Sequence, residues 1–261
     1  MANGGATPTR LLAGQATKLS RTMHDIRYDE LHDEFVVTNP FAQAILTFPG
    51  SATGNRPPLR IIQGPSTKMT GAGRVEVDPA HDEIFVPSGS SILVYPRKAN
   101  GDTAPLRIIR GPDTQLRSAS ATAVDPVNNF LVVGLEGGPG KPGGLLIFGR
   151  TAEGNARPRG VIRGPRTGII RINQIAVYPP RKWIIATQPG DAAQMEPEGA
   201  FVGVWSLNDS GDVAPRWKIN ANPKTGMMKP RGIALDPRNK EIIVADMRKN
   251  SVLTYYFPEI F

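Results

Sequence analysis

Cysteine is absent from the 261-residue sequence, and long apolar runs are absent as well. Without cysteine the chain can form no disulfide framework, no thiolate nucleophile and no thiolate metal site. No run approaches the roughly 18 to 20 apolar residues of a membrane-spanning helix. Residues 1–14, MANGGATPTRLLAG, have neither the basic start nor the apolar core of a signal peptide, so we expect a soluble chain without an export signal. A signal removed from a longer precursor would make it extracellular or periplasmic.

Aromatic residues are few, at 7% of the chain, whereas 28 glycines and 25 prolines are present. Helix-period apolar runs are scarce, and this composition favours many short strands joined by turns. Lysine and arginine outnumber aspartate and glutamate by 31 to 23, which gives a formal net charge of +8. Such a basic protein attracts anionic partners, although charge alone does not determine the fold.

One short motif recurs five times along the chain. A threonine lies in GQATKL, GPSTKM, GPDTQL, GPRTGI and NPKTGM, and an apolar residue follows two positions later each time. Three runs of strand character follow in each unit, for example GRVEVDP, DEIFVPSG and SSILVYP, and a PLRII-type run then opens the next unit. Four short strands in about 50 residues are typical of a propeller blade. The sequence therefore predicts an all-β fold, a single β-propeller of five four-stranded blades.

The repeat also predicts how the ring closes. We expect one domain, 1–261, with units at about 16–63, 64–110, 111–163, 164–219 and 220–261. The last unit ends after its third strand, while ANGGATPTR at the start of the chain is similar to ANGDTAPLR at 99–107. We therefore expect residues 8–14 to supply the fourth strand of the last blade, since this pairing would remove an exposed sheet edge.

The recurring threonines are interpreted as structural residues. A hydroxyl two residues after proline can hydrogen-bond to the local backbone, and five copies suit a turn better than an asymmetric catalytic site. The hairpins before the last four motifs each carry a glycine followed by Asn or Asp, where glycine supplies the positive φ of a tight turn.

The last unit resembles an NHL-type repeat. In the stretch 231–257 and the proline before it, the residues that match the pattern are Pro230, Gly232, Ile233, Ala234, Asp236, Val244, Ala245, Asp246 and Asn250. The other four units match less well, because they lack the Val-Ala-Asp of the second strand. The resemblance implies a β-propeller, although propellers of this type usually have six blades. The family includes lyases, lactonases and many binding modules, so the resemblance does not select one function.

The channel mouth is the expected ligand-binding face. The resemblance implies that the connections between blades share this face, and basic residues follow each motif. We expect a positive rim, which would attract an anionic ligand, formed by Arg21, Arg74, Arg117, Arg171, Lys229 and Arg231. The alternative is that these are solvated loop charges.

Candidates for catalysis are sparse. His24 lies near the start of a channel-lining strand, and Glu136 and Asp246 lie at the ends of second strands. Together they could bind a hard divalent cation such as Ca²⁺ or perform acid/base chemistry, if the ring brings them together. Lactonase-like propellers hold a metal with carboxylates and amides, and lyase-like ones use paired histidines. No motif here establishes either set.

The favoured interpretation is a non-enzymatic binding or assembly module. It would engage an anionic ligand or a protein partner at the channel mouth, which the inserts 135–144 and 188–200 would shape, and it would need no cofactor. The alternative is a metal-assisted lyase or lactonase with its site at the channel. Nucleic acid is disfavoured, since aromatic residues do not alternate with the basic ones on this face. The sequence leaves the oligomeric state open.

Overall fold

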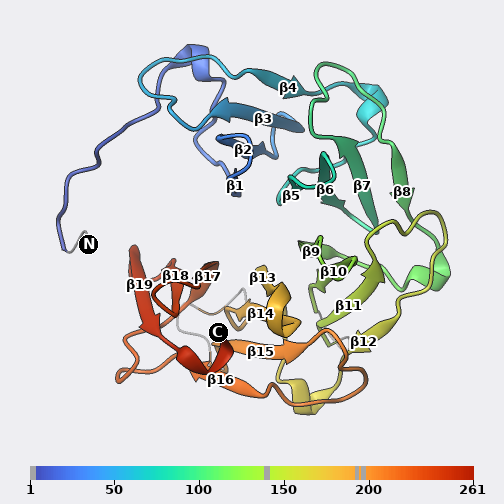
Figure 1. Ribbon diagram of the computed structural model, residues 1–261, viewed down its shortest axis with the longest axis vertical. Coiled ribbons are helices and arrows are strands. Elements are labelled where there is room, and N and C mark those ends of the chain that lie inside the picture. The colour runs from blue at the N-terminus through green and yellow to red at the C-terminus, as the bar shows by residue number, and fades with distance from the viewer. Residues whose placement is uncertain (1–3, 138–141, 192–193, 195–197) are drawn as a thin grey trace.

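The computed structural model of the chain describes residues 4–137, 142–191, 194 and 198–261. Within these residues, five antiparallel sheets stand side by side around a common axis (Figure 1). Each sheet is one blade, and its strands follow one another in chain order from the axis outward. The all-β fold and the five-bladed propeller predicted from the repeat are therefore confirmed.

The strand boundaries repeat with the period of the sequence motif. Blade 1 consists of β1 (Ile26–Asp29), β2 (Glu34–Asn39), β3 (Ala44–Pro49) and β4 (Arg60–Ile62), and blade 2 of β5 (Glu76–Asp78), β6 (Glu83–Ser88), β7 (Ser91–Pro96) and β8 (Arg107–Ile109). Blade 3 consists of β9 (Ala119–Asp125), β10 (Phe130–Leu135), β11 (Gly144–Gly149) and β12 (Gly160–Ile162). Blade 4 consists of β13 (Gln174–Tyr178), β14 (Trp183–Gln188), β15 (Phe201–Ser206) and β16 (Trp217–Asn220), and blade 5 of β17 (Pro230–Asp236), β18 (Glu241–Asp246) and β19 (Ser251–Tyr256).

Six single-turn 3-10 helices complete the described elements. Four of them contain the recurring threonine motif: η1 (Gln15–Thr17), η2 (Pro65–Thr67), η3 (Pro112–Thr114) and η4 (Pro165–Thr167). The other two are η5 (Pro179–Arg181) and η6 (Pro258–Ile260). Within the described part of the chain, no helix is long and apolar enough to cross a membrane.

The core lies between the blades, because blades 2, 3 and 4 bury both faces of their sheets against their neighbours, and blades 1 and 5 bury one. Between blades 1 and 2, for example, Val36 and Ile45 pack with Ile84, Val86 and Tyr95. Successive side chains of a strand point to opposite faces, so each central strand of blades 2, 3 and 4 contributes to two such interfaces. Near-continuous apolar runs such as FLVVGL in β10 are the consequence.

The threonine motif forms a cap between neighbouring blades. Thr67 Oγ1 donates to the carbonyl oxygen of Gly64 over 2.6 Å, and the same bond recurs in the other three motif helices. Gly64 has a φ of 138°, and a Cβ there would lie 2.4 Å from Oδ1 of Asp102. That Asp102 oxygen accepts the backbone N–H of Ser66. The predicted structural role of the threonine is confirmed, and the Gly-Asn/Asp hairpin supplies the second half of the cap.

Ion pairs that include arginines of the outermost strands link adjacent blades. Glu83 of β6 binds Arg107 of its own blade and Arg150 of blade 3, whose Nη1 lies 2.7 Å from the carboxylate. Glu34 makes the equivalent pairs with Arg60 and with Arg97 of blade 2. The arginines of the fourth strands are therefore partners of carboxylates.

The predicted closure of the last blade needs correction. The sheet of blade 5 has three strands, and no residue from 8 to 14 pairs with β19. Leu12 instead bridges to Gly54 of blade 1, as Ile62 does to Gly101 of blade 2. The N-terminal segment therefore lies in the position of a fourth strand relative to blade 1, but β19 stands away from it, and Figure 1 shows an opening between blades 5 and 1.

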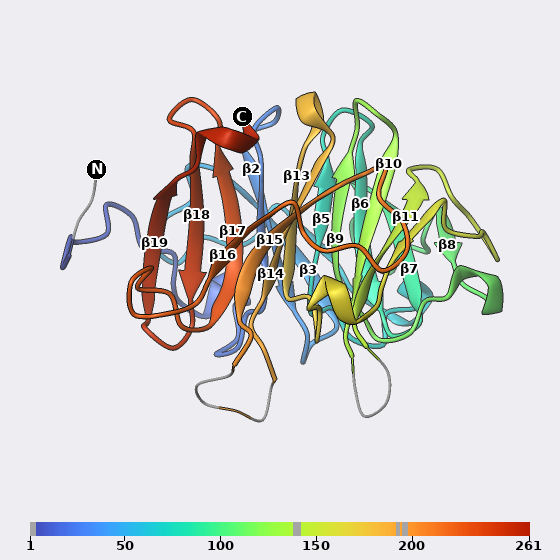
Figure 2. The ribbon, with the colours of Figure 1, turned by 90° about the horizontal axis from the view of Figure 1, so that it is seen from below.

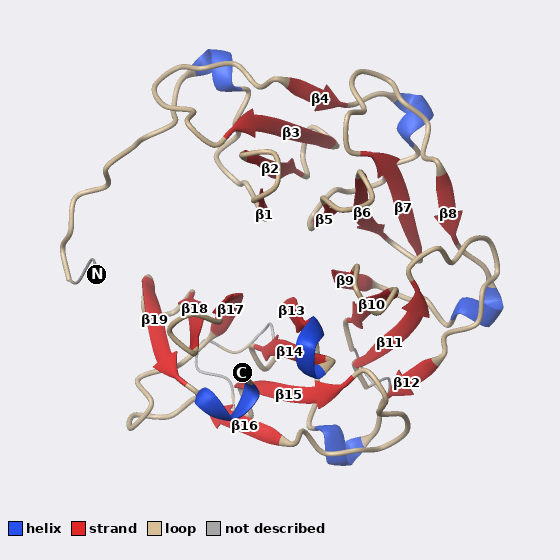
Figure 3. Cartoon of the chain, in the orientation of Figure 1, coloured by secondary structure: helices blue, strands red, loops and turns tan. Residues whose placement is uncertain are grey.

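The two long inserts and the four motif helices lie on different parts of the ring. Figure 2 shows that the described ends of the inserts 135–144 and 188–200 project from the same face of the ring. Figure 3 shows the four motif helices on the outer side of the ring rather than around the channel mouth. Residues 138–141, 192–193 and 195–197 of the two inserts lie outside the described residues, so their predicted shaping of a ligand site stays a prediction.

Candidate functional site

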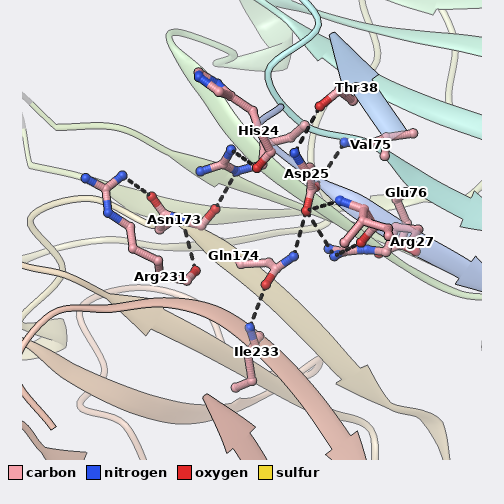
Figure 4. A network of polar contacts seen from close by, with 12 residues as sticks. His24, Asp25, Arg27, Thr38, Val75, Glu76, Asn173, Gln174, Arg231 and Ile233 are labelled. Atoms are coloured by element: carbon pink, nitrogen blue, oxygen red, sulfur yellow. Dashed lines mark hydrogen bonds and ion pairs between the residues drawn. The ribbon is translucent and has the colours of Figure 1, made fainter. Parts of the chain in front are cut away.

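Polar residues lie at or next to the first residue of several inner strands. Asp25, immediately before β1, is buried and accepts hydrogen bonds from three blades (Figure 4). Its carboxylate accepts the side-chain amide of Gln174 at 2.9 Å and the backbone N–H of Val75 at 3.1 Å. Its own backbone N–H donates to Thr38 Oγ1 at 3.0 Å. Asp25 is therefore the acceptor that joins blades 1, 2 and 4 at the ring axis.

Gln174 extends this network to blade 5. While its amide nitrogen donates to Asp25, its Oε1 accepts the backbone N–H of Ile233 in β17 (Figure 4). One side chain thus satisfies groups on two blades that are not its own.

An ion pair occupies the deeper part of the same channel. Arg27 Nε lies 3.1 Å from Glu76 on the neighbouring inner strand, and Arg27 Nη1 lies 3.4 Å from Asp25. Burial raises the pKa of Glu76 above its ordinary value, although Arg27 works in the opposite direction. In this part of the channel one guanidinium group thus faces two carboxyl groups.

Nearer the mouth, two arginines from different blades share one asparagine. Arg74 of blade 2 donates its Nε to the carbonyl oxygen of Asn173 at 3.1 Å, and Arg231 of blade 5 donates Nη1 to Asn173 Oδ1 at 2.8 Å. Asn173 in turn donates its Nδ2 amide group to the carbonyl oxygen of Arg231 at 3.0 Å. Neutral acceptors therefore hold both guanidinium groups in place, and their charges are not cancelled by these contacts.

Two further cations lie in the same region, and both are almost fully buried. Arg171 donates Nε to the carbonyl oxygen of Gly190 at 2.9 Å, and Lys229 donates Nζ to the carbonyl of Gln194 at 2.6 Å. Glu136 lies 3.6 Å from Arg171 Nη1. We name the four cations Arg74, Arg171, Lys229 and Arg231 the mouth cluster.

The cations of the mouth cluster repel one another. Burial, followed by the charges of Arg171 and Arg74, lowers the pKa of Arg231. Burial, followed by Arg231 and Arg171, likewise lowers the pKa of Lys229. Each of these positive charges lowers the pKa of its neighbours, so an anion placed among them would be stabilised.

His24 lies within the field of this cluster. Burial first, and then the charges of Arg74 and Arg231, lower the pKa of His24, while Asp25 works to raise it. The imidazole is therefore held mainly neutral near pH 7, and an anion placed beside the two arginines would reverse part of that effect.

A cleft opens beside the mouth cluster. It has a volume of about 830 Å³, and it is lined by His24, Arg74, Asn173 and Arg231 at one side and by apolar side chains of blades 1 and 5 at the other. The volume lies within the range of small-molecule sites in proteins.

The structure brings only part of the predicted rim together. Arg74, Arg171, Lys229 and Arg231 form the mouth cluster, whereas Arg21 is an exposed loop residue and Arg117 donates to the carbonyl of Pro142. The reason is that the motif helices lie on the outer side of the ring, and the chain then runs inward. Basic residues reach the mouth where the chain arrives at an inner strand.

The three catalytic candidates have different surroundings. Both carboxylate oxygens of Asp246 accept backbone N–H groups, from Met228, Lys229, Arg248 and Lys249 at 2.7 to 3.1 Å, so this residue organises the adjoining loops. Glu136 pairs with Arg171, and His24 faces arginines. Among the residues that the structure describes, no group of three or more His, Cys, Asp or Glu is arranged to hold a metal ion.

Sequence reasoning missed Asp25, Asn173 and Gln174. Their signal is positional, because the residues four and five places before the end of each inner strand line the axis. In the five blades these pairs are His24-Asp25, Gly73-Arg74, Ser120-Ala121, Asn173-Gln174 and Arg231-Gly232. Alignment of the five units on the turn after the inner strand would have shown this polar column.

Comparisons with known proteins identify the fold but no family. No family model matches the chain, and no curated protein matches it. Among solved structures, the chain is similar to Kuenenia stuttgartiensis hydrazine synthase, with a TM-score of 0.61 and 10% sequence identity over 92% of this chain. The match spans 58% of the chain of that structure. At this identity the similarity concerns the fold alone.

Proposed function

We propose that the protein is a non-enzymatic binding module of the NHL-like propeller type, which takes an anionic ligand at the channel mouth. The observation that carries the proposal is the mouth cluster, in which four cations from blades 2, 4 and 5 lie within each other's field. Acids also act on the cluster: Glu136 lies 3.6 Å from Arg171, and the charge of Asp191 acts on Lys229. Asp25 lies deeper and is engaged by Gln174, Val75 and Arg27.

Unused donors in the cluster support the same function. Arg231 Nε and Arg171 Nη2 are enclosed and make no hydrogen bond with the described residues. A buried donor without an acceptor costs about 1 to 3 kcal/mol, and more when it is charged. An anion with several oxygens would supply these acceptors and stabilise the arrangement.

The test uses inorganic pyrophosphate as a probe in isothermal titration calorimetry. We expect binding that weakens steeply with added NaCl, because the contacts are charged. Arg231→Gln should reduce the affinity at least tenfold, since the guanidinium is held toward the mouth by Asn173. Arg117→Gln is the matched control, because Arg117 lies outside the mouth cluster. Equal losses in the two variants, or no binding by the unaltered protein, would refute the proposal.

A further inference from the structure

The opening between blades 5 and 1 leaves an interface of the propeller uncovered. In blade 1 the side chains that face blade 5 include Leu12, Leu19 and Phe35, and all three are only half-buried. Their counterparts one repeat later, between blades 1 and 2, are Ile62, Met69 and Ile84, which are at most 6% exposed because the neighbouring blade covers them. Blade 1 therefore presents a core-type apolar face to the cleft.

Blade 5 presents the opposite wall. Ala245 and Met247 line the same cleft, and Met247 is 53% exposed. Val252 on β19 is 69% exposed, and β19 has no partner on its outer side among the described strands. The two walls have the composition of an interblade core, but they do not contact each other as the other blades do.

The cleft has different chemistry at its two sides. Toward the ring axis it is lined by His24, Arg74 and Arg231, and toward the outside by Leu12, Leu19, Met23, Phe35, Val37 and Met247. The acid at its inner side, Asp25, pairs with Arg27 at 3.4 Å, and its charge also acts on Arg74. Two arginines face one aspartate in the lining, so the cleft combines a net positive charge with an apolar wall.

We propose that this cleft binds an amphiphilic anion, with its carboxylate, sulfate or phosphate head at Arg74 and Arg231 and its hydrocarbon part between blades 1 and 5. The assignment rests on the proposed function, because it places the head at the mouth cluster. Charge complementarity selects an anionic head over a cationic one. Burial of the uncovered apolar side chains by a hydrocarbon chain would stabilise the complex in proportion to the area removed from water.

The size of the cleft is compatible with such a ligand. About 830 Å³ exceeds the room that a phosphate ion needs and falls within the range in which drug-sized molecules bind. The cleft is open to solvent along the seam, so a chain can enter without rearrangement of the blades.

The experiment measures the affinity of the full chain for sodium hexanoate, octanoate and decanoate, below their micellar concentrations, by isothermal titration calorimetry. We expect the affinity to rise roughly fourfold for each added methylene, which corresponds to complete burial of that group. Decyltrimethylammonium, with a hydrocarbon chain one methylene longer and the opposite charge, should bind at least tenfold more weakly than decanoate. Met247→Gln should flatten the dependence on chain length and leave pyrophosphate binding intact.

The control for that variant is Val127→Gln, which alters an apolar side chain that is 73% exposed and lies outside the cleft. It should change neither measurement. Affinity that does not depend on chain length, with pyrophosphate still bound, would overturn this inference and leave the proposed function standing. Loss of both kinds of binding would overturn both. Equal affinity for decanoate and decyltrimethylammonium would show general apolar adsorption and would also overturn the inference.

The N-terminal segment and a second copy of the chain are the two other possible occupants of the cleft, and each is tested directly. The chain lacks cysteine, so the double variant Leu11→Cys, Leu253→Cys carries a single pair of thiols. Rapid, complete disulfide formation without amphiphile would show that the N-terminal segment closes the seam and would overturn the inference. A stable dimer in sedimentation velocity that dissociates on addition of decanoate would support the cleft as the binding site, whereas a dimer that excludes decanoate would overturn it.

Discussion

Gln174 donates its side-chain amide to Asp25 over 2.9 Å and thereby joins blade 4 to blade 1 across the ring axis. The two residues are 149 positions apart in the sequence. Neighbouring blades are held by apolar packing, but blades 1 and 4 are not neighbours. This hydrogen bond therefore supplies a contact that interblade packing cannot supply, and the bond from Ile233 to Gln174 extends the link to blade 5.

Removal of this link should destabilise the fold. We expect Gln174→Ala to lower the free energy of unfolding by about 2 kcal/mol, because the Asp25 carboxylate loses a donor and the Ile233 N–H loses its acceptor. Urea denaturation monitored by circular dichroism measures the change. Gln15→Ala, in an exposed turn, is the matched control and should stay within about 0.5 kcal/mol. A similar effect of the two substitutions would contradict the bridging role.

The ion pairs of Glu83 should contribute to stability in a pH-dependent way. Burial works to raise the pKa of Glu83, but Arg107 and Arg150 outweigh it and hold the pKa below its ordinary value of 4.5. A group with a lowered pKa stabilises the folded chain above its unfolded pKa, and the contribution is lost as the pH falls through the folded pKa. Glu83→Gln should therefore destabilise the protein at pH 7 by roughly 2 kcal/mol and by much less below the folded pKa.

The control for Glu83 is Asp113→Asn, because Asp113 pairs with Arg157 at the exposed surface. This substitution should cost less than about 0.5 kcal/mol at any pH. Thermal unfolding measured between acid and neutral pH distinguishes the two. A Glu83→Gln effect that does not shrink on acidification would rule out the ionised carboxylate as its cause.

Gly64 of the threonine motif should not tolerate a larger side chain, because the cap fills the space beside it. Gly64→Ala would place a Cβ 2.4 Å from Asp102 Oδ1 at a φ of 138°, so both the backbone and the cap must shift. We expect a loss of more than about 2 kcal/mol in the free energy of unfolding. Gly54→Ala, at a φ of 65° with nothing within 4 Å, should cost only about 1 kcal/mol. Equal losses would show that backbone strain alone matters.

Anion binding at the mouth should strengthen as the pH falls. Burial and the charges of Arg74 and Arg231 lower the pKa of free His24, against the opposing effect of Asp25. An anion beside the arginines would raise that pKa, so the complex would favour protonated His24. The affinity should therefore be highest below the free pKa and decline as the pH rises through the bound pKa. Pyrophosphate titrations across pH 5 to 8 measure this, after correction for the ionisation of the probe. An unchanged profile in His24→Gln would exclude His24 as the titrating group.

The repeat made the blades predictable because each unit repeats the same local rules. Glycine at positive φ, proline that ends an inner strand, and period-two apolar runs act within about 50 residues, and all of them are visible in one unit. The way the ring ends between blades 5 and 1 was not predictable in this way. The register of Leu12 is set by Gly54, whereas pairing with β19 depends on how blade 5 is placed relative to blade 1. That placement depends on packing around the whole ring.

Most of the cations of the candidate site were predictable from the sequence, but the polar residues that hold them were not. Arg74, Arg171, Lys229 and Arg231 were expected at the mouth, and the structure brings these four together. Arg21 and Arg117 were expected there for the same reason, but they lie on the outward part of the connection. Asp25, Asn173 and Gln174 were missed, because their importance arises from contacts between blades that are far apart in the sequence.

The most direct measurement is a crystal structure of the protein from crystals soaked in sodium bromide, with bromide located by its anomalous scattering. An anion site at the channel mouth predicts the strongest peak beside the guanidinium groups of Arg74 and Arg231, and its loss in Arg231→Gln crystals. Peaks confined to outer-rim cations such as Lys18, Lys68 and Arg117, with none at the mouth, would contradict it.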